Sequence, residues 1–293
     1  MMFEIKSDRL RVEIAHPNEV PNITTRFDRA GFITEIVLDG VHRFCATEPN
    51  NLSHPSSGGR GLCSEYVFDV SAEAKIGEPF PKFGVGLLNK FEDAPYKFWE
   101  RYDAEPYNIR VEDSKDGARF ITEPRFCMGY AISQKKDVWV KDNRLIMQIT
   151  VKNEGEKPVS IREYCHNFLT INSMALGPDY KIRMDSIKDM GKDVLNGQIK
   201  GDGHGFTFAQ YSPSPASVKV PLEEIQIGNP KIFEWSMINE ASGARIDVKD
   251  EIDICGMTMW CADHIVSVEA FHKLELAPGQ SNTWQRTWIF DNI

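Results

Sequence analysis

Apolar and polar residues alternate along much of the chain with the period of a β-strand. In 144–152 (RLIMQITVK), every second position from Leu145 to Val151 is apolar, so one face of a strand would be continuously apolar. The stretch 137–140 has strand composition as well, and the Lys-Asp-Asn of 141–143 is typical of a tight turn. The pattern therefore predicts an antiparallel hairpin over 137–152.

The same rhythm returns in 32–45, 233–261 and 265–290, and each of these segments is interrupted by Gly, Pro, Asn or Asp at the turns. No amphipathic helix longer than a few turns is indicated. Many short strands must bury one face of each sheet against another sheet. The sequence therefore predicts an all-β protein built as a large antiparallel β-sandwich.

Two stretches interrupt the strand pattern. Residues 45–64 are rich in Asn, Ser, Pro and Gly and are typical of a long functional loop, and 174–230 is also irregular. No linker, charge block or internal repeat divides the chain. We expect one domain over 1–293.

Composition limits the possible partners. The net charge is −9, which argues against nucleic acid because phosphate binding requires clustered Lys and Arg. The N-terminus lacks a basic start followed by an apolar run, and no segment has the roughly 20 apolar residues of a membrane helix. The six cysteines are scattered without metal-ligand spacing, as expected of reduced thiols. These features favour a cytoplasmic protein that binds no membrane, and they assign no oligomeric state.

No cofactor or metal motif is present, so we expect chemistry carried by side chains alone, with no cofactor and no metal. If 161–172 is a strand, Tyr164, His166 and Phe168 share the face opposite the core. Aromatic rings can stack on the C–H faces of a sugar, and an imidazole can bond its hydroxyls. The alternative is a structural histidine bonded to a backbone carbonyl.

A second candidate segment is 266–276, in which Val268, Ala270 and Leu274 lie on one face and Glu269 lies with Phe271 on the other. The simpler interpretation of Glu269 is a solvated surface carboxylate. Its apolar sequence neighbours favour a position in the middle of a sheet instead.

Several segments resemble the galactose mutarotase (aldose 1-epimerase) family. The sequence Tyr-Cys-His-Asn-Phe of 164–168 is similar to the histidine region of that family, and Val-Ser-Val-Glu of 266–269 is similar to the strand that ends in its catalytic glutamate. A late hairpin of that fold resembles the segment 233–248. Two elements near its sugar site resemble the segments 27–31 and 58–62. The likeness extends over nearly the whole chain in the order of its elements.

This resemblance implies the galactose mutarotase-like sandwich (supersandwich) and an enzyme that interconverts the anomers of a sugar. Glu269 would take the proton of the anomeric hydroxyl while His166 protonates the ring oxygen. Arg60, within Gly-Gly-Arg-Gly, resembles an arginine that the family directs at sugar hydroxyls, and the alternative is an arginine of a surface loop. Tyr164 and Phe271 would help to bind the ring.

The chain also departs from the family. Where galactose mutarotases have a further histidine, this chain offers Lys82, which could suit an anionic sugar or could equally be solvated. The family's binding aspartate has no clear counterpart, although Asp179 and Asp185 are candidates. Two alternatives follow: an epimerase that acts at another carbon, or a sugar-binding or regulatory module without turnover.

Overall fold

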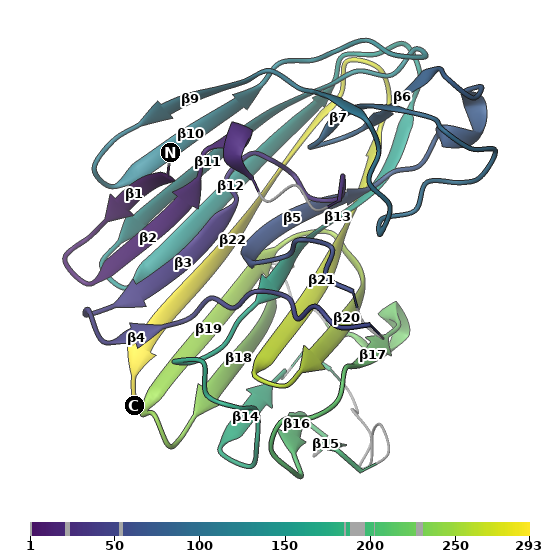
Figure 1. The fold of residues 1–293 in the computed structure, drawn as a ribbon. Coiled ribbons are helices and arrows are strands. Elements are labelled where there is room, and N and C mark those ends of the chain that lie inside the picture. Colours follow the sequence, from purple (N-terminus) through teal and green to yellow (C-terminus); the bar gives the residue numbers. More distant parts are fainter. Residues whose placement is uncertain are drawn as a thin grey trace.

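Strands dominate the computed structural model, which describes residues 2–20, 24–52, 55–184, 186–187, 197–201, 203–226 and 231–293. Two large sheets lie face to face, as Figure 1 shows. The predicted hairpin forms as expected, since β11 (Ile132–Lys141) and β12 (Arg144–Asn153) pair antiparallel. The turn between them places Asp142 at a φ of 55°, a left-handed conformation that Asp tolerates better than most residues.

The first large sheet contains nine strands among the described residues, and its neighbouring strands are antiparallel. A short strand, β4 (His42–Arg43), pairs with β3 outside the main path. The main path runs through β1 (Met2–Lys6), β2 (Leu10–Ala15), β3 (Ile33–Leu38), β5 (Gly61–Val67), β13 (Val159–Phe168), β21 (Ile265–Leu276), β20 (Ile254–Ala262) and β17 (Ala216–Val220).

The second large sheet contains ten strands within the described ranges. Its order is β15 (Ile199–Gly201), β16 (Gly205–Phe208), β14 (Tyr180–Arg183), β18 (Phe233–Asn239), β19 (Ala244–Glu251), β22 (Ser281–Asn292), β12, β11, β10 (Gly117–Thr122) and β9 (Ile109–Asp113). A small third sheet orders β6 (Pro79–Lys82), β7 (Gly86–Asn89) and β8 (Ala104–Pro106). Three single-turn 3₁₀ helices complete the described elements: η1 (Pro17–Glu19), η2 (Ser71–Glu73) and η3 (Leu222–Glu224).

The main core lies between the two large sheets and joins apolar side chains of both. Phe44 packs on Phe290 across the sandwich, with ring centroids 4.7 Å apart. Trp288 of β22 reaches the other sheet and donates its indole N–H to Asn167 Oδ1 of β13 at 2.9 Å. The prediction of an all-β antiparallel sandwich is confirmed.

The two irregular stretches contain more regular structure than their composition indicates. β5 already begins at Gly61, inside the expected loop 45–64. The stretch 174–230 includes the short strands β14 to β17, whose apolar runs are too brief to stand out in the sequence. No helix in the described part of the chain is long and apolar enough to cross a membrane.

Candidate active site

Two strands in the middle of the first sheet, β13 and β21, part locally and carry the two principal candidate residues. Their backbone pairing runs as far as Glu163 with His272 and resumes at the isolated bridge of Leu169 with Val266. Both pairings share one register, in which His166 lies opposite Glu269. This register brings together two residues that are 103 positions apart in the sequence, and the gap in the ladder lies at their level.

Side chains bridge this gap in place of backbone hydrogen bonds. The Asn167 backbone N–H donates to Ser267 Oγ at 3.1 Å, and that hydroxyl donates to Glu269 Oε1 at 2.9 Å. The side-chain amide of Asn167 donates from Nδ2 to the carbonyl of Val268 at 2.5 Å. Because Trp288 fixes the same amide from the second sheet, the gap is held at a defined width.

His166 and Glu269 are in direct contact. The distance from Nδ1 to Oε1 is 2.8 Å, and the residues are only 2% and 8% exposed. A carboxylate and an imidazole at this distance can exchange a proton between them.

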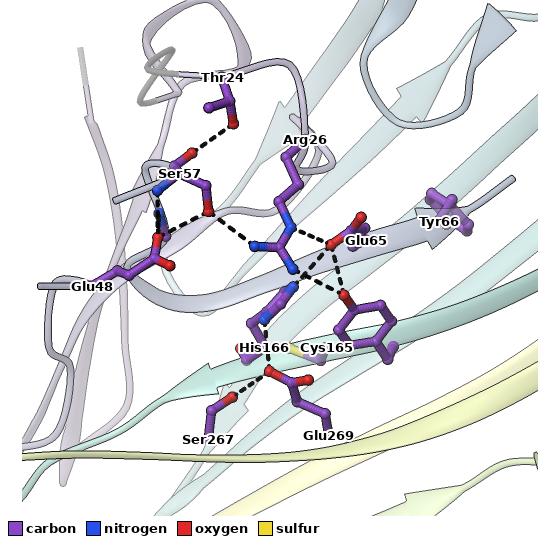
Figure 2. A network of polar contacts seen from close by, with 12 residues as sticks. Thr24, Arg26, Glu48, Ser57, Glu65, Tyr66, Cys165, His166, Ser267 and Glu269 are labelled. Atoms are coloured by element: carbon purple, nitrogen blue, oxygen red, sulfur yellow. Dashed lines mark hydrogen bonds and ion pairs between the residues drawn. The ribbon is translucent and has the colours of Figure 1, made fainter. Parts of the chain in front are cut away.

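A second carboxylate binds the opposite nitrogen of the imidazole. Glu65 of β5 places Oε2 3.1 Å from His166 Nε2, and the same oxygen accepts from Arg26 Nε at 2.6 Å and from the Tyr164 hydroxyl at 2.7 Å. Lys82 Nζ lies 3.6 Å from Glu65 Oε1. Figure 2 shows Glu65 between Arg26 and His166, with Glu269 on the other side of the imidazole.

The surrounding charges set the ionisation of this network. Burial alone would raise the pKa of Glu65, but Arg26 and then Lys82 outweigh it and hold that pKa well below its usual range. Burial acts to lower the pKa of His166, but the adjacent Glu269 carboxylate, supported by the hydrogen bond that the imidazole donates to Glu65, raises it overall. The structure therefore favours an imidazolium between two carboxylates.

A cavity of about 360 Å³ opens beside His166 and Glu269. Its walls combine aromatic rings with a few polar groups, the composition typical of a small-molecule site. The lining residues are Arg26, Glu48, Pro55, Phe98, Trp99, His166, Phe168, Thr258, Trp260 and Glu269.

The glycine-rich segment 58–61 packs against Phe168, one of the lining residues of this cavity. A Cβ on Gly59 would lie 2.3 Å from the ring of Phe168, so only glycine lets the loop pack against that ring. The Phe168 ring stacks parallel to His166, with centroids 5.2 Å apart. The loop thus fixes the aromatic wall beside the imidazole.

The predicted residue Lys82 does not face the cavity, so its expected contact with an anionic sugar is a wrong prediction. It is 1% exposed, and its ammonium donates to the carbonyl of Tyr66 at 2.6 Å and lies near Glu65. Burial lowers its pKa, although the Glu65 carboxylate opposes this effect. Its charge supports Glu65 instead.

The other sequence candidates that the structure describes, Arg60, Tyr164, Phe271 and Asp179, do not line the cavity. Arg60 donates from Nε to the carbonyl of Thr34 at 2.9 Å. Tyr164 is buried and holds Glu65, and Phe271 packs edge-on against Tyr164 at 4.8 Å. Asp179 accepts from the exposed Tyr211, and Asp185 lies outside the described residues.

Three charged residues of the site were not identified from the sequence, namely Arg26, Glu48 and Glu65. The aromatic lining residues Phe98, Trp99 and Trp260 were not identified either. The signal for Glu65 is its place in the strand 61–67, where it shares the face of Cys63 opposite the core residues Leu62 and Tyr66. Nothing local marks Arg26. Within the described ranges, no group of three or more His, Cys, Asp or Glu side chains is arranged to hold a metal ion.

Comparison with known proteins places the fold. No family model matches the chain, and no curated protein matches its sequence. Solved structures do match over the full length. A galactose mutarotase-like protein from Clostridium acetobutylicum has a TM-score of 0.61 at 10% identity, covering 100% of this chain and 95% of that one.

Two further structures agree. A galactose mutarotase-like protein from Lactobacillus casei has a TM-score of 0.59 at 12% identity, covering 99% of this chain and 100% of its own. A galactose mutarotase related enzyme from Lactobacillus acidophilus has a TM-score of 0.59 at 12% identity, covering 100% and 98%. The chain therefore has the fold of the galactose mutarotase-like proteins.

Proposed function

We propose that this protein is an aldose 1-epimerase-like enzyme that interconverts the anomers of a sugar. The observation that carries the proposal is the contact of His166 Nδ1 with Glu269 Oε1 at the wall of an aromatic cavity. The names of the structures that share the fold support the same class of activity.

The proposed reaction uses one group as base and the other as acid. Glu269 removes the proton from the anomeric hydroxyl, the bond from C1 to the ring oxygen breaks, and His166 donates its proton to that oxygen. Rotation about the C1–C2 bond followed by the reverse proton transfers closes the ring as the other anomer. Because both reacting oxygens are bonded to C1, an acid and a base in contact with each other can serve them.

Glu65 would set which proton of His166 reacts. It occupies Nε2, and the same carboxylate oxygen is held by Arg26 and Tyr164. The proton on Nδ1, next to Glu269, is then the one available to the sugar. Glu65 is thus a positioning residue that acts through the imidazole.

The test is anomer conversion, measured by NMR exchange over a panel of aldoses. General acid–base groups contribute about 10²–10⁴-fold in rate, so Glu269→Gln should lower turnover by that order and change sugar binding little. His166→Asn should behave similarly. Glu275→Gln, an exposed carboxylate on the same strand that bonds Ser160, is the matched control and should keep the wild-type rate.

Wild-type turnover in a folded Glu269→Gln variant would contradict the proposal. If the unmodified protein binds a sugar without accelerating anomer conversion, the alternative of a non-catalytic sugar-binding or regulatory module stands.

A further inference from the structure

Two aromatic side chains at the cavity are unusually exposed. Phe98 and Trp99 are 40% and 55% exposed, yet both line the cavity that contains His166 and Glu269. They belong to the segment between β7 and β8 and contact each other edge-on, with centroids 4.9 Å apart. Adjacent exposed rings that continue a binding cavity are typical of a ligand contact surface.

The segment that carries these rings is anchored. Tyr96 donates its hydroxyl to the carbonyl of Thr25 at 3.0 Å, and its backbone N–H bonds Ser71 Oγ at 3.0 Å. The Lys97 N–H bonds the Tyr102 hydroxyl at 2.9 Å. The rings at 98 and 99 are therefore presented by a segment with fixed ends.

The Arg26 guanidinium ties Phe98 to the polar network. Its central carbon lies 4.1 Å from the centroid of the Phe98 ring, a cation–π contact. The same guanidinium donates from Nη1 to Ser57 Oγ at 2.9 Å. Phe98 and Ser57 thus both contact the Arg26 side chain, which also bonds Glu65.

Glu48 adds a carboxylate oxygen to this part of the cavity. Its Oε2 accepts from the Ser57 N–H at 2.8 Å, the Ser57 hydroxyl at 3.0 Å and the Gly59 N–H at 3.2 Å. Among the described residues, no hydrogen bond reaches Oε1, although Glu48 lines the cavity. One oxygen is fixed by the loop, and the other can accept from a ligand.

We propose that Phe98, Trp99 and Glu48 form a second sugar subsite, so that the substrate is the reducing-end unit of a di- or oligosaccharide. This inference rests on the proposed function, because the reducing end must place its anomeric carbon at His166 and Glu269. The next sugar would stack its C–H face on the exposed rings and donate a hydroxyl to Glu48 Oε1. A purely apolar ligand would leave the Glu48 carboxylate without a hydrogen-bond partner, and the negative charge of an anionic ligand would be repelled by it.

The experiment is calorimetry with matched sugar pairs, each consisting of a disaccharide and the monosaccharide of its reducing end. The pairs have glucose, galactose or mannose at the reducing end. In at least one pair the disaccharide should bind about tenfold more tightly, and Trp99→Ala should lower the affinity of the disaccharide several-fold more than that of the monosaccharide. Trp99→Phe should retain part of the gain because it keeps an aromatic face.

Phe126→Ala supplies the matched control, since Phe126 is 64% exposed on another loop. It should leave every affinity unchanged. Equal affinity within every pair, equal losses for both members of a pair in Trp99→Ala, or no binding at all would overturn the subsite. Calorimetry needs no turnover, so a protein that binds disaccharides selectively without converting anomers would refute the proposed enzyme and leave the subsite intact.

Discussion

At the scale of single residues, the two carboxylates bonded to His166 decide its charge. Glu269 and Glu65 occupy the two ring nitrogens, and the pKa of the imidazole is raised. A raised pKa keeps the acid protonated to higher pH, so the activity should fall on the alkaline side only above the ordinary histidine range. The alkaline limb of kcat/KM therefore reports on the deprotonation of His166.

We predict that Glu65→Gln moves this limb to lower pH. The change removes one negative charge and leaves Arg26 and Lys82 without their partner, and both effects disfavour the imidazolium. The pH profile of kcat/KM and the NMR titration of His166 measure the shift. An equal loss of activity at every pH would indicate a merely structural role.

Glu35→Gln is the control for this prediction. Glu35 is also buried and paired with an arginine, Arg43. It does not contact the imidazole, so its removal should leave the pH profile in place.

Residue-level prediction from the sequence worked where strand parity was enough. His166 and Glu269 could be assigned to the faces opposite the core because side chains alternate along a strand. Parity could not show that Lys82 turns its ammonium inward to Glu65, since that depends on a strand outside the large sheets. It could not pair Glu65 with His166 either, because 101 positions separate them.

At the scale of elements, the local parting of β13 and β21 creates the site. In a continuous ladder, the backbone groups of the two strands would bond each other directly. Here the side chains of Asn167 and Ser267 make the hydrogen bonds between the strands instead. The sequence predicts both strands but not the gap, because a missing backbone pairing leaves no mark on the alternation. The hairpins were predictable for the opposite reason, since their turns carry Asp, Asn, Pro and Gly.

We predict that Ser267→Ala lowers turnover about three- to tenfold. The hydroxyl donates to Glu269 Oε1, and a hydrogen bond to a charged group contributes about 1.5–3 kcal/mol, part of which orients the base. The base itself remains, so the loss should be much smaller than in Glu269→Gln. Steady-state kinetics with each variant give the ratio.

Ser160→Ala tests the same change elsewhere on these strands. Its hydroxyl bonds Glu275, an exposed carboxylate where the ladder is intact. Activity should be unaffected. If both serine variants lose turnover equally, the positioning of Glu269 by Ser267 is refuted.

At the scale of the whole molecule, a buried charge cluster joins the two large sheets behind the site. Arg286 of β22 donates to Glu163 of β13 at 2.7 Å and to Asp250 of β19 at 2.8 Å. All three are at most 1% exposed. The sandwich could be predicted from the apolar faces, but Arg286 lies in the middle of such a face, between Trp284 and Trp288, where alternation predicts an apolar residue.

One arginine faces two carboxylates in this cluster, so its removal would leave two buried negative charges with no partner. We predict that Arg286→Met lowers the free energy of unfolding by about 3–5 kcal/mol at neutral pH. Burial raises the pKa of Asp250 even beside Arg286, so without the arginine this carboxylate should take up a proton on mild acidification. Part of the lost stability should therefore return as the pH falls, because the folded variant then binds more protons than the unfolded chain.

Denaturant unfolding from pH 5 to 8 measures this dependence. The triple variant Arg286→Met, Glu163→Gln, Asp250→Asn removes every charge of the cluster and should recover much of the loss at neutral pH, since no ion is left unpaired. A single variant as stable as the wild-type protein at neutral pH would show that the ion cluster does not hold the sheets together. The sandwich would then depend on apolar contacts such as those of Trp288 and Phe290.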